Sequence, residues 1–260
     1  MTNLSEQTLS RPDVQAKQFE NLEEKIGVNF EHPEYLVQAF VHRSYLNENR
    51  DFPLGHNERL EFLGDAVLEL VVTEYLFNEY GNPEGELTNW RAALVNAKML
   101  ASVAHEIGFE EYLFLSHGES KDAGTKARDY ILANTMEALI GAIYVDQGYG
   151  MSQQFLARWI LPKLPYILEN GLYMDAKSRF QESAQEHIGF TPTYKVLNEH
   201  GPDHMKSFKV GLFLEKELIA SGEGTSKQEA QTEAAEAGLK VKKWKGPTVN
   251  VIRKSPEDPI

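Results

Sequence analysis

Cysteine is absent from the 260 residues of this chain, which excludes disulfide bonds and thiolate metal ligands. No apolar run approaches the roughly 20 residues that a helix needs to cross a bilayer, so no membrane-spanning segment is expected. The first 18 residues are polar, include Glu6 and Asp13, and lack the apolar core of a secretory signal peptide. Together these absences predict a cytoplasmic protein.

A surplus of basic residues is also missing. The formal net charge is −13, whereas nucleic-acid binders usually show a basic footprint. The acidity is uneven, however: residues 175–245 hold 11 Lys and Arg against 11 Asp and Glu, and residues 246–260 also balance. The whole excess therefore lies in residues 1–174, which indicates two parts of different electrostatic character.

The hydrophobic pattern divides the chain at the same place. Residues 14–170 show helical spacing without a convincing strand, which predicts an all-α domain. Its expected helices cover residues 18–26, 34–40, 57–80, 87–107, 128–148 and 155–170, the last shaped by Pro162 and Pro165. Residues 175–245 predict a small α+β domain in the order α-β-β-β-α, with helices at 176–188 and 226–244 and strands at 193–199, 205–214 and 217–224. Residues 1–13 and 246–260 are expected to be flexible tails.

The helix predicted from Asn57, a suitable N-cap, to about Tyr80 carries a stripe of carboxylates. At roughly 100° per residue, the acidic side chains that fall within about 80° of one another are Glu58, Glu61, Asp65 and Glu69. The opposite side is apolar and consists of Leu60, Leu63, Val67, Leu70 and Val71. Carboxylates at these spacings repel one another, so the stripe predicts a cation supplied from outside the chain. A solvated acidic face is the alternative, but Phe62 projects to the acidic side, where such a face would not place it.

A second polar pair lies about 70 residues later, where Asn134, Glu137 and Gly141 share one helical face. Gly141 would let a neighbouring helix approach closely. Packing this face against Glu61 and Asp65 would gather three carboxylates and one amide, a set of hard oxygen ligands that suits Mg²⁺ or Mn²⁺. Such a metal can activate water and neutralise charge on a phosphodiester. The alternative for the pair alone is surface decoration or a helix contact.

These motifs resemble the ribonuclease III family. The resemblance rests on Asn57–Leu70, on His42-Arg43-Ser44 and on Ile131–Gly141, and it extends over about residues 18–243. It implies a homodimeric endoribonuclease that cleaves double-stranded RNA to 5′-phosphate and 3′-hydroxyl products, in the processing of rRNA and mRNA. It also implies metal ligands at Glu61, Asp65 and Glu137, with Asp65, Glu137 and Glu58 as the catalytic group. The residue that matches Phe62 reaches the partner subunit at the dimer interface.

One position departs from the family pattern, which usually has Asp where this chain has Asn134. An amide oxygen can still ligate a metal, but one negative charge is lost. The expected metal set is therefore Glu61, Asp65, Asn134 and Glu137, with Mg²⁺ as the cofactor and Mn²⁺ as a substitute. Three explanations compete: a natural variant that still cleaves, an engineered change, and a degenerate site that binds without cutting. We expect a working or weakened nuclease, and a catalytically inactive double-stranded RNA-binding protein is the rival hypothesis.

The small domain resembles a double-stranded RNA-binding domain, in which three regions contact successive grooves of the duplex. The matching residues are Gln181, Glu182 and Gln185 on the first helix, His204 in the loop after the first strand, and Ser226 with Lys227 at the start of the last helix. Gln228 replaces a basic residue of the family pattern, which weakens the phosphate contact there. Singly, each of these residues is typical of ordinary surface, and only their order indicates one RNA-binding face.

Overall fold

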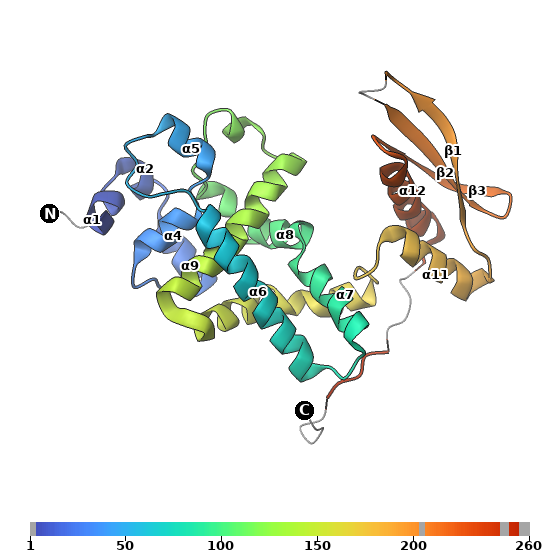
Figure 1. Cartoon of the computed structure of the whole chain (residues 1–260), viewed down its shortest axis with the longest axis horizontal. Helices are drawn as coiled ribbons and strands as arrows, with labels where there is room; N and C mark the ends of the chain where they lie inside the picture. Colours follow the sequence, from blue (N-terminus) through green and yellow to red (C-terminus); the bar gives the residue numbers. More distant parts are fainter. Residues whose placement is uncertain (1–3, 203–205, 245–249, 255–260) are drawn as a thin grey trace. The chain divides into compact units, whose positions relative to one another are not determined.

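The computed structural model describes residues 4–202, 206–244 and 250–254. It divides the chain into two compact units, Met1–Leu164 with Arg253–Ile260, and Pro165–Ile252 (Figure 1). The first is helical, and the second has the order α-β-β-β-α, so the predicted fold class is confirmed. Within the described ranges, no helix is long and apolar enough to cross a membrane.

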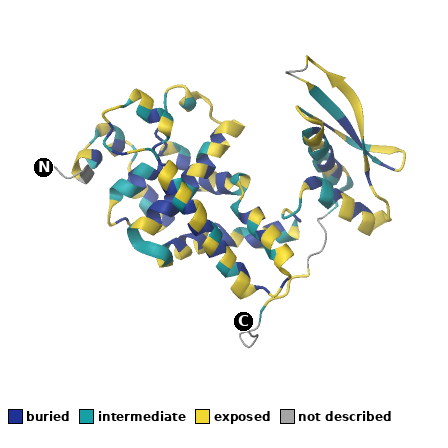
Figure 2. Ribbon diagram, viewed as in Figure 1, coloured by how far each residue is buried: buried dark blue, intermediate teal, exposed yellow. Residues whose placement is uncertain are grey.

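Each predicted helix of the first unit has a helical counterpart in the same order, and α1, α2 and α5 are present in addition. The helices of this unit are α1 Leu4–Leu9, α2 Pro12–Gln15, α3 Phe19–Ile26, α4 Pro33–Ala39, α5 Arg43–Glu48, α6 Glu58–Glu79, α7 Glu84–Val95, α8 Ala97–Ile107 and α9 Lys126–Trp159, with 3₁₀ turns η1 Phe109–Glu111, η2 Glu119–Lys121 and η3 Leu161–Lys163. The helix α10, Leu164–Glu169, follows as the chain leaves this unit. Buried residues gather along the facing sides of the long helices, and exposed residues lie on their outer sides (Figure 2).

One predicted helix is divided in the structure, and another continues past its predicted end. The block expected over residues 87–107 is interrupted at Asn96, whose side chain accepts a hydrogen bond from the backbone N–H of Met99 and so caps α8. The helix α9 continues past Gly148, but that residue has φ 76° and ψ −171°, a conformation that glycine adopts without a steric penalty. Gly148 therefore ends the first straight segment, where the sequence predicts the end of a helix.

The chain start differs from its prediction as a flexible lead. In place of a loose segment, α1 and α2 occupy most of residues 4–15. Val14 is buried, and the Lys17 ammonium donates to the carbonyl oxygen of Glu111 at 2.9 Å. These contacts reach far along the chain, so a local pattern in residues 1–13 does not reveal them.

The two longest helices, α6 and α9, cross in backbone contact. A Cβ atom built on Gly64 would collide with the backbone of Glu137 and Gly141, and one built on Gly141 would collide with the backbone of Leu60. Two glycines therefore face each other across the crossing, and no side chain separates the helices there. This close approach brings the acidic side of α6 against the second polar pair of the sequence.

The second unit is a three-stranded antiparallel sheet in the order β1-β2-β3, with two helices packed on it. Its elements are α11 Ala176–Ile188, β1 Thr193–His200, β2 Ser207–Leu214, β3 Glu217–Gly224 and α12 Lys227–Lys242. Val196 pairs with Val210 and Phe208 with Gly224, and the register shifts once in β1 and once in β3. The core joins the helices to β2 through Phe180, Ala184, Leu212, Leu214, Ala234 and Ala235.

After the small unit the chain returns to the helical unit. Arg253 forms an antiparallel bridge with Tyr80, and the backbone N–H of Lys254 donates to the carbonyl oxygen of Glu79 at 3.0 Å. The Arg253 guanidinium lies 4.3 Å from the centre of the Tyr80 ring, and the Lys254 ammonium lies 4.3 Å from that of Phe77. Part of the tail that the sequence predicts to be flexible, residues 253–254, is thus fixed on the end of α6.

Candidate active site at the crossing of α6 and α9

The first turn of α6 is fixed by the segment that precedes α5. The backbone N–H of Asn57 donates to the carbonyl oxygen of Val41 at 2.9 Å, and its side-chain amide donates to that of Ala39 at 3.0 Å. Asn57 is the N-cap residue, as expected, but its buried side chain points inward and caps no helical N–H. The segment that carries His42 is held in turn, because the His42 N–H donates to Phe114 at 3.1 Å.

Where the helices cross, the carboxylates of Glu61, Asp65 and Glu137 lie near enough for their charges to affect one another. Glu61 and Glu137 are half-buried, and Asp65 is exposed beside them. Burial raises the pKa of Glu137 to about 7, and the negative charges of Asp65 and Glu61 add to this effect. Burial likewise raises the pKa of Glu61, with Glu58 and Asp65 contributing. The crossing therefore concentrates more negative charge than the surrounding protein neutralises.

The carboxylates do not yet converge on one point. Within the part of the chain that the structure describes, no three His, Asp or Glu side chains stand close enough together to hold a metal ion. Glu58, Glu61 and Asn134 line a hollow of about 310 Å³ between the helices, and Glu58 and Asn134 are both exposed there. The structure thus places Glu58, Glu61 and Asn134 around one hollow, whereas Asp65 and Glu137 do not line it.

The fourth carboxylate of the stripe has a different surrounding. The Glu69 carboxylate forms an ion pair with the Arg91 side chain of α7 at 2.9 Å. The positive charge beside Glu69 therefore comes from the chain itself. Glu58 has weaker partners: Arg43 at 3.6 Å and His56 at 3.7 Å, all at partly exposed positions. Within the stripe, the carboxylates for which the structure gives no ion pair are therefore Glu61 and Asp65, which lie beside Glu137 of α9.

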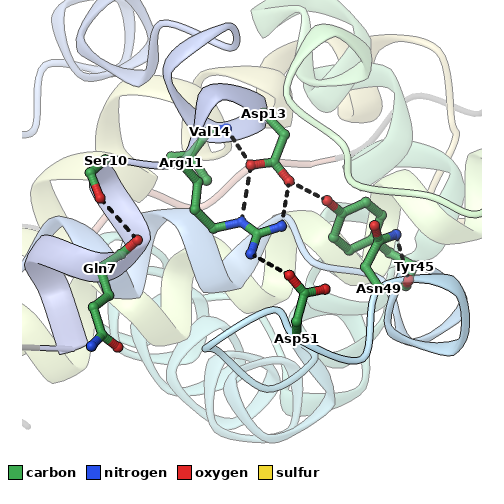
Figure 3. Close-up of polar contacts among 8 residues, drawn as sticks. All are labelled: Gln7, Ser10, Arg11, Asp13, Val14, Tyr45, Asn49 and Asp51. Atoms are coloured by element: carbon green, nitrogen blue, oxygen red, sulfur yellow. Dashed lines mark hydrogen bonds and ion pairs between the residues drawn. The ribbon is translucent and has the colours of Figure 1, made fainter.

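A polar cluster braces α5 against the chain start (Figure 3). The Arg11 guanidinium donates to both carboxylate oxygens of Asp13, at 3.1 and 3.3 Å, and to Asp51 at 3.1 Å. The Tyr45 hydroxyl donates to Asp13 at 2.5 Å, and its pKa is raised by burial and by this carboxylate. Since α5 begins at Arg43 and its N-cap is His42, this brace supports one wall of the hollow.

Phe62 lies outside the hollow, on the outer surface of α6. It is 83% exposed, a large value for a phenylalanine. Leu70, which the helical pattern assigns to the covered apolar side, is 58% exposed as well. The apolar positions of α6 that are buried are Leu60, Val67, Leu68, Val71, Val72 and Leu76. The exposed apolar side chains of α6 leave a surface that the monomer does not cover.

In the second unit, three of the expected RNA-binding residues share an accessible face. Gln181, Glu182 and Gln185 are exposed on α11, beside the buried Ser183 and Ala184. His204 lies outside the described residues. The structure therefore places the first-helix group on the surface and leaves the loop contact a prediction.

At the start of α12, both expected residues already have partners. The Ser226 hydroxyl accepts a hydrogen bond from the backbone N–H of Glu229 at 3.1 Å, so it caps the helix. The exposed Lys227 ammonium lies 3.0 Å from Glu199 of β1 and 5.5 Å from the centre of the Phe208 ring. A phosphate at Lys227 would have to compete with Glu199.

Sequence reasoning missed two features of the helical site. Gly64 was not assigned a role, although it matches Gly141 across the crossing. His42, Arg43 and Tyr130 line the hollow, but only the first two belong to a motif that the sequence singled out. A glycine within an otherwise continuous helical pattern was the available signal for Gly64. Tyr130, the residue before Ile131, has no such signal.

Comparisons with known proteins agree with this architecture. Residues 32–164 match the family model Ribonuclease-III-like, and residues 176–242 match the double-stranded RNA binding motif. Ribonuclease 3 of Bacillus velezensis is 44% identical over 227 residues, covering 86% of this chain and 89% of the relative. Ribonuclease 3 of a Nitratiruptor species is 42% identical over 228 residues, covering 87% and 98%.

Among solved structures, the nuclease domain of Campylobacter jejuni ribonuclease III, described for flexibility in the region of dimer formation, is 37% identical with a TM-score of 0.52. It covers 57% of this chain and 99% of that domain. The solved structure matches a nuclease domain alone, whereas the two ribonuclease 3 relatives match this chain over most of its length and theirs. The chain belongs to the ribonuclease III family and is an endoribonuclease with a helical nuclease domain and a double-stranded RNA-binding domain.

Proposed function

We propose that the chain hydrolyses double-stranded RNA with Mg²⁺ held at the crossing of α6 and α9, where Mn²⁺ can substitute. The observation that carries this proposal is the backbone contact of Gly64 with Glu137 and Gly141, which sets the acidic side of α6 against Glu137, where burial and the charges of Asp65 and Glu61 raise the pKa of Glu137 to about 7. A divalent cation would neutralise this excess charge. The available donors are carboxylate and amide oxygens, the ligands that Mg²⁺ and Mn²⁺ prefer. The donor set therefore fits the metal.

In this proposal Glu61, Asp65, Asn134 and Glu137 hold the metal, and Asp65, Glu137 and Glu58 form the catalytic group. When bound, the metal supplies activation of water and neutralisation of charge at the phosphate. The contact of Gly64 with the backbone of α9 sets the distance between the two sets of ligands. The expected products carry a 5′-phosphate and a 3′-hydroxyl, and the processing of rRNA and mRNA in the cytoplasm is the corresponding role.

Duplex RNA is held by the small domain in this proposal. Gln181, Glu182 and Gln185 form one contact region, and Ser226 with Lys227 forms another, together with His204. The backbone N–H groups at the start of α12 add donors for phosphate. Because the helical part is strongly acidic, docking depends on cations and on these contacts, so affinity should fall steeply with salt.

We propose further that the enzyme acts as a homodimer through the outer surface of α6. Phe62 and Leu70 are 83% and 58% exposed, and large exposed apolar side chains on one helix are typical of interfaces. The region involved in dimer formation is also the subject of the C. jejuni nuclease-domain structure. A second copy of this chain would cover both side chains.

Cleavage of a long RNA duplex, followed on a gel with Mg²⁺, Mn²⁺ or EDTA, tests the nuclease proposal. Cleavage with either metal and none with EDTA is expected. Glu61→Gln and Glu137→Gln should abolish it, whereas Glu24→Gln, an exposed carboxylate of α3, should not. Duplex binding without cleavage in either metal would instead favour the inactive RNA-binding protein, a hypothesis that the family membership does not favour. Gain of cleavage in Asn134→Asp would then identify the amide as the cause.

A further inference from the structure

A second hollow adjoins the one that holds the carboxylates. The first, of about 310 Å³, is lined by His42, Arg43, Asn57, Glu58, Glu61, Tyr130, Ile131 and Asn134. The second, of about 480 Å³, is lined by His42, Arg43, Ser44, Asn47, Glu119, Ala127, Tyr130 and Ile131. Four residues belong to both, so the two hollows share a wall made by the start of α5 and the first turns of α9. A chain that enters one hollow can continue into the other.

The charge changes from one hollow to the next. Glu58 and Glu61 line the first, and Glu119 is the acidic residue of the second. Among the described residues that line either hollow, Arg43 is the one Lys or Arg, and it lines both. Its side chain is 73% exposed and lies 3.6 Å from Glu58, itself 49% exposed. Such exposed pairs contribute little, so Arg43 can leave Glu58 for a stronger partner at small cost.

Besides Glu58 and Glu119, neutral hydrogen-bonding groups line the hollows near this cation. Nδ1 of His42 lies 2.8 Å from the Ser44 hydroxyl oxygen, so this ring nitrogen is already engaged within the segment that carries Arg43. Asn47 and Tyr130, which line the second hollow, are both exposed, Tyr130 by 63%. Ser44 is already engaged, because its hydroxyl oxygen accepts from the backbone N–H of Ser116 at 3.1 Å. One guanidinium flanked by an amide and a phenol suits a phosphodiester and its ribose better than it suits a second metal.

We propose that Arg43, assisted by Asn47 and Tyr130, binds a phosphodiester of the RNA strand being cleaved. This phosphodiester neighbours the one that reacts. The inference rests on the proposed function, which places the reacting phosphodiester at Glu61, Asp65 and Glu137. Arg43 then guides the strand past the carboxylates and offsets the repulsion between them and the RNA backbone. Nothing in this role requires Arg43 to touch the reacting atoms, so it is a residue for substrate binding.

The test measures duplex affinity of the full chain in Ca²⁺, a hard divalent cation, by fluorescence anisotropy. The duplexes carry one uncharged methylphosphonate linkage at successive positions around the cleavage site. At one position the neutral linkage should weaken wild-type binding about tenfold, the loss expected for a charge-assisted hydrogen bond. In Arg43→Ala the same linkage should cost nothing further, and the slope of log affinity against log salt should fall by about one.

Two variants serve as controls. Arg50→Ala removes the same charge from an exposed position that lines neither hollow, and its linkage profile should match wild type. Arg43→Lys keeps the charge and should recover part of the affinity and the salt slope. Because Arg43 is mostly exposed, Arg43→Ala should melt at the wild-type temperature.

The proposal fails if Arg43→Ala binds like wild type, or if its effect adds to that of the neutral linkage at every position. If the two effects on duplex affinity add, and Glu58→Gln loses as much affinity as Arg43→Ala, then Arg43 acts only by orienting Glu58. If inorganic phosphate weakens duplex binding by wild type but not by Arg43→Ala, this would support Arg43 as a site that also binds a free anion. Cleavage in Mg²⁺ is scored separately, so a wild-type chain that binds but does not cut defeats the nuclease proposal and leaves this binding test decisive.

Discussion

Replacing Gly64 by alanine should drive apart the two helices that carry the candidate site. The added Cβ would lie far inside the 3.0 Å limit that real Cβ atoms respect, against the carbonyl oxygen and carbon of Glu137 and the backbone nitrogen of Gly141. All three are backbone atoms, so no side chain can rotate away. Relief requires a shift of α6 relative to α9.

Two opposing effects decide the size of the change. Alanine stabilises a helix interior by about 1 kcal/mol relative to glycine. Overpacking a core typically costs about 1–3 kcal/mol, and backbone collisions belong at the upper end. Gly64→Ala should therefore lower the free energy of unfolding by about 2 kcal/mol. Gly150→Ala provides a matched control on α9, because that glycine is exposed and its Cβ would meet no atom within 4 Å. It should raise stability by up to about 1 kcal/mol.

Urea unfolding followed by circular dichroism measures both values, and single-turnover cleavage supplies a second readout. Displacing catalytic groups by about 1 Å can reduce the rate about a hundredfold, so Gly64→Ala should lose activity beyond its loss of stability. Gly150→Ala should cleave as well as wild type. If Gly64→Ala were as stable as Gly150→Ala and equally active, the helices would not depend on this backbone contact, and the reasoning would be refuted.

Other predictions concern charge, the brace and the outer surface of α6. The raised pKa of Glu137 means that its ionisation opposes folding, a cost absent below pH 4.5 and complete above about 7. In EDTA, Glu137→Gln should thus raise the free energy of unfolding more at pH 8 than at pH 5, and equal effects in urea titrations would contradict this. Tyr45→Phe removes the donor to Asp13 and should cost about 1.5–3 kcal/mol by the same method, whereas a neutral result would show that the brace is dispensable. Phe62→Ala should convert a dimer into a monomer at micromolar concentration in sedimentation equilibrium, and Tyr166→Ala, a similarly exposed aromatic, should not. A wild-type monomer would exclude the proposed interface.

Much of the fold could be predicted because it follows from periodic local patterns. The helix at residues 176–188 and the strand at residues 217–224 have the predicted bounds, since glycines and alternating apolar residues mark their ends. The pairing of the acidic stripe with Asn134 and Glu137 was also accessible, because each polar face is backed by an apolar one. Gly141 added the expectation of a close approach, which the structure confirms.

The remaining features depend on contacts between distant residues. The helices α1 and α2 contain 6 and 4 residues, too short to leave a periodic signal. The bond from Tyr45 to Asp13 spans 32 positions, which no local pattern encodes. Leu70 follows the apolar pattern of α6 yet is exposed, because periodicity identifies an apolar face without identifying what covers it. The ion pair between Glu69 of α6 and Arg91 of α7 likewise cannot be predicted from a local pattern.

The return of the chain to Tyr80 changes the status of the small domain from an appendage to an insertion. Its host unit contributes both Leu164, before it, and Arg253, after it. A protease cut in the segment that follows α12 would leave the small domain covalently joined to the helical unit through Leu164, whereas a cut after Leu164 would leave only the noncovalent contacts of residues 253–254. Deleting the chain from residue 246 onward would do more than shorten a tail: it would remove the Arg253 and Lys254 side chains from the Tyr80 and Phe77 rings and uncover the end of α6.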